Sequence, residues 1–225
     1  MVAADSLMTR TSNPPPDTMA SGGRSVSEVR VATVGDIELL VRTITLAFEH
    51  DPVWSPAMAP TEGRSDRRPD IWRCYLLGAL RYPWTWTADD ATAASVWVPP
   101  GGTEMSSEQE DGLDALIDVA LGARADDYHE TMARFDAAHP RSEPHYYLSL
   151  LATHPEHRGH GIGMALLAAN LAVIDRTGMP AYLESTNPAN DRRYASVGFE
   201  RHGSFVVPYE DRVVTTMWRP PRSGS

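Results

Sequence analysis

The segment that most constrains the fold runs over residues 148–167 and reads LSLLATHPEHRGHGIGMALL. An apolar stretch suited to a strand is followed directly by a basic, glycine-rich turn and then by an apolar helical stretch. Gly159, Gly161 and Gly163 let the backbone turn sharply and approach a ligand closely. The unpaired N–H groups at the start of the following helix point toward the same place. The segment therefore predicts a strand, a turn and a helix that together bind an anion such as a diphosphate.

The residues around this turn exclude two common phosphate ligands. A nucleotide triphosphate loop needs a lysine, but all 20 basic residues of the chain are arginine. A dinucleotide loop needs a third small residue where this chain has Leu166. What remains is the pattern Arg-x-x-Gly-x-Gly, formed by Arg158, Gly161 and Gly163, with Arg158 suited to phosphate.

This pattern resembles the acetyl-CoA signature of the GNAT N-acetyltransferase superfamily. A second block over residues 181–199 resembles the next strand and helix of that family, with Asn187 and Asn190 ahead of Tyr194. The similarity extends over residues 28–219. From Glu143 to the C-terminus it looks closest to puromycin N-acetyltransferase and related actinobacterial enzymes. The resemblance implies an α/β fold with a twisted, mostly antiparallel mixed sheet of six to seven strands and helices on both faces.

The hydrophobic pattern of the chain agrees with that architecture. Residues 1–27, rich in Ser, Gly and Pro, are predicted to be a disordered tail, and residues 28–225 a single acetyltransferase domain. A helix capped by Asp36 is expected over 36–48, a loop over 50–65, a helix over 66–82, and two helical pieces over 108–138 that meet near Gly122. Two more helices should follow Gly161 and Pro188. Strands are expected at 28–34, 85–87, 93–98, 148–153, 181–186, 204–208 and 213–218.

The resemblance also implies which residues bind acetyl-CoA. One strand should splay from its neighbour, so that its backbone pairs with the pantetheine arm and one of its N–H groups polarises the thioester carbonyl. The phosphate turn and two amide side chains complete the predicted site. The predicted cofactor-binding residues are Leu151, Ala152, Thr153, Arg158, Gly159, His160, Gly161, Ile162, Gly163, Asn187 and Asn190.

Acetyl transfer to an amine needs a base for the amine and an acid for the departing thiolate. By resemblance, Tyr194 is the acid, because the family places a tyrosine beside the sulfur. Glu184, a lone carboxylate in a predicted strand, is the best candidate for the base. A loop after the first helix and two tyrosines just before the predicted strand 148–153 should border the acceptor. These substrate-binding candidates are Glu49, His50, Asp51, Tyr146 and Tyr147.

Composition limits the partners of the chain. Its net charge of −10 disfavours nucleic acid and anionic membrane, and no apolar run is long enough to cross a membrane. With a single cysteine, Cys74, no internal disulfide can form. His154, His157 and His160 recur every three residues, but Pro155 prevents a regular helix there, so no metal site is predicted. We expect a cytoplasmic protein without a secretory signal.

These observations predict an acetyl-CoA-dependent N-acetyltransferase that acts directly on an amine of a small molecule, such as a cationic metabolite or antibiotic. A protein or peptide N-acetyltransferase and a non-catalytic acyl-CoA sensor are the alternatives. The acceptor and the oligomeric state, with a homodimer among the options, stay open.

Overall fold

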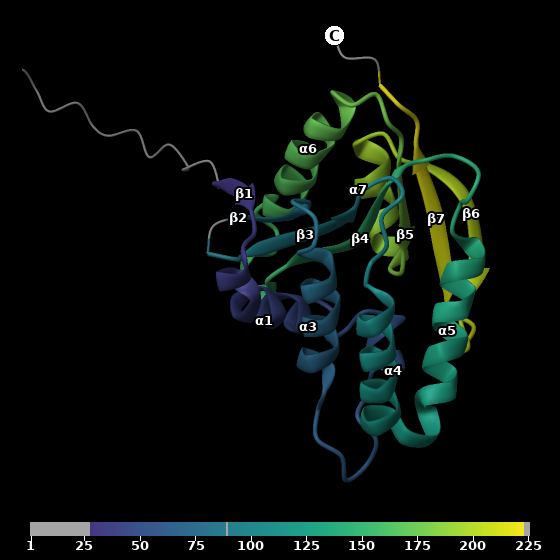
Figure 1. Ribbon diagram of the computed structural model, residues 1–225. Helices are drawn as coiled ribbons and strands as arrows, with labels where there is room; N and C mark the ends of the chain where they lie inside the picture. Colours follow the sequence, from purple (N-terminus) through teal and green to yellow (C-terminus); the bar gives the residue numbers. More distant parts are fainter. Residues whose placement is uncertain (1–27, 89, 223–225) are drawn as a thin grey trace, which may run out of the picture.

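The computed structural model describes residues 28–88 and 90–222, so the tail predicted over 1–27 lies outside the described residues. One sheet of seven strands runs through the molecule (Figure 1). The strands are β1 (Val29–Val31), β2 (Thr85–Ala88), β3 (Ala93–Val98), β4 (Tyr146–Thr153), β5 (Ala181–Ser185), β6 (Glu200–Val206) and β7 (Val213–Arg219). Their order across the sheet is β1-β2-β3-β4-β5-β7-β6. Only β4 and β5 pair in parallel, which confirms the predicted mixed, mostly antiparallel sheet.

Seven α-helices and several single 3₁₀ turns connect the described strands. The helices are α1 (Ile37–Ala47), α2 (Trp54–Ala57), α3 (Arg68–Ala79), α4 (Ser107–Leu121), α5 (Ala125–Ala138), α6 (Ile162–Asp175) and α7 (Asp191–Ser196). The 3₁₀ turns are Val34–Asp36, Gly122–Arg124, Pro155–His157 and Pro188–Asn190. None of the described helices combines the length and the apolar character that a membrane span requires.

Two local predictions were wrong. The loop expected over 50–65 contains the short helix α2. Asp36 does not cap α1 by a side-chain hydrogen bond. Its carboxylate instead accepts hydrogen bonds from the backbone N–H of Thr33, at 2.8 Å, and from the Thr33 hydroxyl, at 2.9 Å. Because Thr33 and Asp36 form this capping box, a 3₁₀ turn begins first and α1 starts at Ile37.

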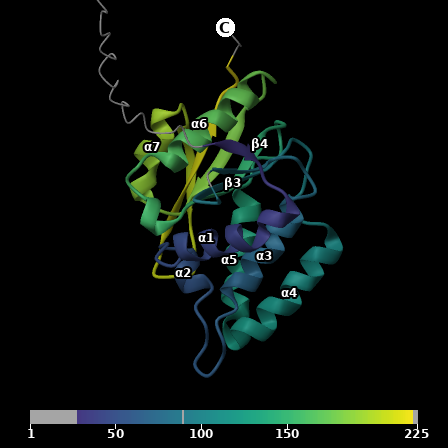
Figure 2. The same cartoon turned by 90° about the vertical axis from the view of Figure 1, so that its left-hand side faces the viewer.

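The helices cover the two faces of the sheet in separate groups (Figure 2). Helices α6 and α7 lie on one face, where Leu167, Leu171 and Tyr194 pack with Trp97 and Phe199. Helices α1, α3, α4 and α5 lie on the other face and share a second, larger core. The α4–α5 pair comes from the segment that the sequence predicts as two helical pieces, and it extends the molecule beyond the sheet.

A β-bulge in β4 decides which side chains face each core. Val96 pairs with Leu150 and Trp97 with Leu148, so Ser149 is an extra residue in β4. As a result Leu148 and Leu150, two residues apart, point into opposite cores. Ser149 is left at the edge where β4 leaves its parallel neighbour, and this is where the candidate site lies.

A buried amide fixes α6 on the sheet. The Oδ1 atom of Asn170 accepts hydrogen bonds from the Ser95 hydroxyl, at 2.6 Å, and from the Trp97 indole N–H, at 3.0 Å. Asn170, Ser95 and Trp97 are all fully buried. Helix α6 begins at the glycine-rich turn, so these bonds also set the position of that turn.

We expect Asn170→Ala to lower the free energy of unfolding by about 2–4 kcal/mol, because two buried donors lose their acceptor. Urea denaturation followed by circular dichroism measures the change. Val119→Ala, at a position 63% exposed on α4, is the control and should change stability by less than about 0.5 kcal/mol. Equal stability of the Asn170 variant and wild type would show that these bonds do not hold α6.

Candidate active site

The candidate site begins where β4 and β5 separate. The two strands pair only between residues 146–148 and 181–183. Beyond that point β4 stays on β3, whereas Glu184 and Ser185 stay on β7. Among the described strands, none pairs with the edge of residues 149–153 that faces β5. The splay predicted for Leu151, Ala152 and Thr153 is therefore confirmed, and it exposes backbone N–H and C=O groups to a wedge between the strands.

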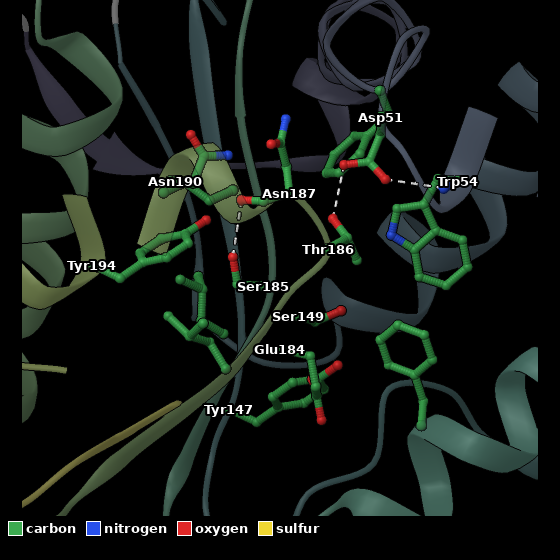
Figure 3. A pocket seen from close by; sticks show the side chains of 15 residues that line it. Asp51, Trp54, Tyr147, Ser149, Glu184, Ser185, Thr186, Asn187, Asn190 and Tyr194 are labelled. Atoms are coloured by element: carbon green, nitrogen blue, oxygen red, sulfur yellow. Dashed lines mark hydrogen bonds between the residues drawn. The ribbon is translucent and has the colours of Figure 1, made fainter. Parts of the chain in front are cut away.

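A small cavity of about 60 Å³ fills this wedge, and its lining includes Ser149, Leu151, Glu184, Asn187 and Tyr194. In Figure 3, Tyr194 lies on one side of the end of β5, and Ser149 and Glu184 lie on the other side. The two residues predicted for acid–base chemistry thus line the same cavity from different elements, α7 and β5.

Tyr194 has the protonation state that a proton donor needs. Burial, together with the charges of Asp51 and Asp191, raises the pKa of Tyr194 to about 12. Its ring packs edge-on against Phe199, with the centroids 6.3 Å apart. The phenol therefore carries its proton at neutral pH and is held by the core of the α6 face.

The glycine-rich turn has the backbone shape expected of an anion site. Gly159 and Gly161 have φ values of 82° and 78°, in the left-handed region that favours glycine. An added Cβ at either residue would meet no atom within 4 Å, which leaves open space in front of the N-terminus of α6. The predicted turn residues Arg158, Gly159, His160, Gly161, Ile162 and Gly163 lie together there.

Two details of the turn differ from the simple phosphate reading. A Cβ at Gly163 would clash with the Thr153 side chain, so this glycine serves the close packing of α6 on β4 and not the room for a ligand. Arg158 donates a hydrogen bond from Nη2 to the carbonyl oxygen of Ala47, at 2.7 Å. This contact ties the turn to the end of α1.

Asp51 connects the loop after α1 to the end of β5. Its Oδ1 accepts hydrogen bonds from the N–H groups of Val53, at 2.9 Å, and Trp54, at 3.0 Å. Its Oδ2 accepts one from the Thr186 hydroxyl, at 2.7 Å (Figure 3). Burial nevertheless raises the pKa of the Asp51 carboxyl. Asp51 lines the small cavity, but both of its oxygens are used to hold the loop in place.

The two predicted amide ligands also have partners within the protein. Asn187 Oδ1 accepts a hydrogen bond from the N–H of Ala189, at 3.0 Å, and so caps the turn before α7. Asn190 Oδ1 accepts one from Arg193 Nη1, also at 3.0 Å. Both residues line the small cavity, so their use as pantetheine ligands stays a prediction.

The structure brings only part of the predicted acceptor wall to the site. Tyr147 lines both the small cavity and a second, larger cleft. Glu49 and His50 are exposed and line neither. Tyr146 also lines neither, because its ring packs on Trp84, with centroids 4.5 Å apart, in the core of the α6 face. Strand alternation explains this outcome, since adjacent residues of a strand face opposite sides.

The larger cleft has a volume of about 980 Å³ and is roofed by α4 and α5. Its aromatic lining includes Trp72, Tyr75 and Tyr128. Five residues line both the cleft and the small cavity, so the two spaces adjoin there, and this shared lining is called the passage. The five residues are Trp54, Phe135, Tyr147, Ser149 and Glu184.

Carboxylates dominate the charged lining of the cleft. Among the described residues, six acidic side chains line it and one arginine, Arg141, which is paired with Asp136. The acidic residues are Glu104, Glu110, Asp114, Asp136, Glu143 and Glu184. Glu184 has a side chain only 3% exposed, and its Oε1 is buried without a hydrogen-bond partner in the described part of the chain.

Glu104 is a functional candidate that the sequence did not reveal. Its carboxylate accepts a hydrogen bond from the hydroxyl of Ser149, the bulge residue. Burial, with the charge of Glu184 nearby, raises the pKa of Glu104. It follows the Pro-Gly turn after β3, in a segment without a recognisable motif, so only the fold shows that it meets β4.

His154, Glu156 and His157 place potential metal-ligand atoms within 4.8 Å of one another beside the glycine-rich turn. The Nδ1 of His154 already accepts a hydrogen bond from the N–H of Glu156, at 3.4 Å. His160, the third histidine of the sequence pattern, is not in this group. The absence of a metal site therefore stays a prediction.

We expect Asp51→Asn to keep the fold, because Oδ1 of asparagine can accept both N–H bonds and Nδ2 can donate to Thr186. A raised folded pKa means that ionised Asp51 weakens the fold as pH rises above the ordinary value of 3.8. The melting temperature of the variant should thus equal or exceed that of wild type at pH 7, and the gain should vanish below that ordinary value. Asp51→Ala, which loses all three bonds, should cost about 1–3 kcal/mol. An equal loss of stability in both variants would show that the three hydrogen bonds of Asp51 do not hold the loop after α1 to the end of β5.

Comparison with known proteins agrees with this geometry. Residues 119–201 match the family model described as an acetyltransferase (GNAT) domain. A structure titled histone acetyltransferase HPA2 and related acetyltransferase, from Corynebacterium glutamicum, has a TM-score of 0.59 at 24% identity, covering 88% of this chain and 98% of that one.

Two further structures share the fold at lower identity. The Drosophila melanogaster polyamine N-acetyltransferase has a TM-score of 0.58 at 15% identity, covering 86% of this chain and 99% of that one. An agmatine N-acetyltransferase has a TM-score of 0.58 at 16% identity, and the match covers 85% of this chain and 98% of that one. The closeness to puromycin N-acetyltransferase stays a prediction. Together, these comparisons show that residues 119–201 match a GNAT acetyltransferase model and that the chain shares its fold with solved acetyltransferases.

Proposed function

We propose that this chain is an N-acetyltransferase that transfers an acetyl group from acetyl-CoA directly to an amine of a small molecule. The observation that supports the proposal most is that Glu184 lines both the small cavity in the wedge and the larger acidic cleft. The wedge beside Tyr194 suits an acyl donor, the acidic cleft suits an amine, and Glu184 lines both.

The described residues fit coenzyme A in chemical type. The unpaired backbone edge of residues 149–153 offers N–H and C=O groups to the amides of a pantetheine arm. The left-handed glycines and the N-terminus of α6 offer donors to a diphosphate. A solved NatC complex bound to a Gag peptide and CoA shares the fold, with a TM-score of 0.50 at 15% identity.

The roles of the side chains follow from their surroundings. Bound acetyl-CoA supplies the activated acetyl group. Glu184, at the passage between the cleft and the wedge, takes a proton from the acceptor nitrogen. Tyr194, on the opposite side of the wedge, holds the proton that the departing sulfur needs. Backbone N–H groups of residues 149–153 are placed to polarise the acyl carbonyl.

The charge of the cleft favours a cationic amine as acceptor. Six carboxylates and one paired arginine among its described lining give a negative potential that attracts cations. The aromatic rings of Trp72, Tyr75 and Tyr128 add apolar walls and π-faces. Two solved proteins that share the fold are a polyamine N-acetyltransferase and an agmatine N-acetyltransferase, and polyamines and agmatine are amines of this kind.

A panel of amines tests the proposal. Full-length protein with acetyl-CoA is incubated with polyamines, agmatine, aminoglycosides, puromycin and short peptides, and free CoA is followed with time. We expect turnover with small cationic amines. Turnover of peptides alone would instead support a peptide N-acetyltransferase. Acetyl-CoA binding without turnover of any amine would support an acyl-CoA sensor.

We expect Tyr194→Phe to lower kcat by about ten- to a thousandfold, the range for loss of a positioned acid. Acetyl-CoA affinity, measured by calorimetry, should change little because the proton matters only as the thioester breaks. The matched control is Tyr82→Phe. The Tyr82 hydroxyl accepts a hydrogen bond from the N–H of Thr103, and Tyr82 lines neither cavity. Full turnover by Tyr194→Phe would show that another group protonates the sulfur.

A further inference from the structure

Two histidines connect Glu184 to the segment that joins α5 to β4. His139 ends α5, and its Nδ1 lies 3.6 Å from Glu184 Oε1. Its Nε2 lies 3.2 Å from Nε2 of His145, which directly precedes β4. The Nδ1 of His145 in turn lies 2.7 Å from the carbonyl oxygen of Glu143. These four groups lie in order between the passage and an exposed residue, Glu143, and only the separation between Glu184 and His139 is longer than a hydrogen bond.

The carbonyl oxygen of Glu143 determines which ring nitrogens of His145 and His139 carry a hydrogen. A carbonyl oxygen only accepts, so Nδ1 of His145 carries a hydrogen and donates it to Glu143. In a neutral His145, Nε2 is then bare and accepts, which makes Nε2 of His139 the donor between the rings. A neutral His139 therefore presents a bare Nδ1 to Glu184. Burial lowers the pKa of His145, which favours its neutral form at neutral pH.

This arrangement accounts for the unpaired oxygen of Glu184. An ionised Oε1 and a bare Nδ1 are both acceptors, so no hydrogen bond joins them, and Oε1 has no other partner in the described part of the chain. A proton that arrives on Glu184 would close this gap, because the carboxyl could then donate to His139.

Other titratable groups also surround His139 and His145. His139 packs on the rings of Tyr147 and Tyr182, at 4.8 and 5.1 Å between centroids. Burial, with Glu184 beside them, raises the pKa of both phenols, so they keep their protons. Glu104 interacts with His139 and Glu184 through its charge. His145 also packs on Trp218 and interacts with Glu143.

We propose that His139 and His145 form a proton relay that removes the acceptor's proton from Glu184 and delivers it to the surface beside Glu143. The proposal rests on the proposed function. An amine that arrives as an ammonium ion must lose one proton before it can attack. Glu184 takes this proton and passes it to Nδ1 of His139, while Nε2–H of His139 passes to His145 and Nδ1–H of His145 leaves to water.

The proton count of the whole reaction balances with one released proton. The ammonium and acetyl-CoA give the acetamide, the free thiol of CoA and one proton. The second proton of the nitrogen, lost when the amide forms, replaces the one that Tyr194 gives to the sulfur. The relay carries only the proton that the ammonium ion loses before the attack. His139 and His145 therefore move this proton and do not contact the acyl group.

Nitrogen-15 NMR of the full chain tests the relay without any turnover. Near pH 7 we expect His145 to carry its hydrogen on Nδ1 and His139 on Nε2. In Glu184→Gln the new amide can donate to Nδ1 of His139, so that resonance should shift, whereas the exposed His202 should not change. A hydrogen on Nδ1 of neutral His139, or an unchanged resonance in Glu184→Gln, would overturn the relay even if the enzyme acetylates an amine.

Kinetics with an acceptor from the panel supply the second readout. We expect His139→Ala to lower kcat at pH 7 by about ten- to a hundredfold, with the KM of acetyl-CoA unchanged, because proton removal is slowed and binding is not. The deficit should shrink as pH rises toward the amine's own pKa of about 10, where more acceptor arrives without its proton. Added imidazole should restore part of the rate.

His202→Ala is the matched control, since it removes an imidazole that stacks on Trp218 from the side of β6 and has no contact with His139. It should keep the rate and the pH profile of wild type. A His139→Ala enzyme with wild-type kcat at pH 7 would overturn the relay. So would a loss that is equal at every pH and insensitive to imidazole, because that pattern indicates a structural role. Failure of wild type to acetylate any amine would count against the proposed function, and the NMR result would still decide the relay.

Discussion

The separation of two parallel strands is the constraint on which the candidate site depends. β4 and β5 pair over three residues each and then diverge, because β4 is held by β3 and β5 by β7. Each strand is thus paired on its outer side, and the wedge lies between the two inner edges. The backbone groups on its inner edge need a partner that the neighbouring strand does not supply. A ligand with amides of its own, placed between the strands, can provide that partner.

The bulge at Ser149 adds a second consequence to the same strand. Because of this one extra residue, Leu148 and Leu150 point into the cores on opposite faces of the sheet. Both faces therefore stay packed beside the wedge. The bulge also brings the Ser149 hydroxyl to the carboxylate of Glu104, at the passage between wedge and cleft. A bulge at this point therefore links the packing of the sheet to the polar lining of the site.

The sequence predicted those features that depend on local pattern. The strand, turn and helix around Gly161 and the block around Tyr194 follow from residues close together in the chain, whereas the mixed sheet was expected from the resemblance to a known family. Side-chain alternation, however, could not be assigned before the strand register was known, and so Tyr146 was grouped with Tyr147 although the two face opposite sides. The bulge that reverses the alternation leaves no mark in the sequence.

The missed residues share a different cause. Glu104 and His139 lie in loops that are distant in sequence from β4 and β5, and each has a plausible local role, after a turn and at a helix end. Only the return of α4 and α5 to the sheet brings them to Ser149 and Glu184. Asp51, predicted to border the acceptor, lines the small cavity, and its hydrogen bonds in addition hold a loop, which the sequence did not predict.

The two sides of the wedge differ in a way that suits opposite proton transfers. Tyr194 lies in the apolar core of the α6 face, where burial raises its pKa to about 12 and keeps the phenol protonated. Glu184 lines the acidic cleft and lies beside His139, which in turn contacts His145. The proposed acid and the proposed base therefore lie on opposite sides of the end of a strand. Because that separation comes from the parting of β4 and β5, the backbone feature that we propose admits the acyl donor also separates the proposed acid from the proposed base.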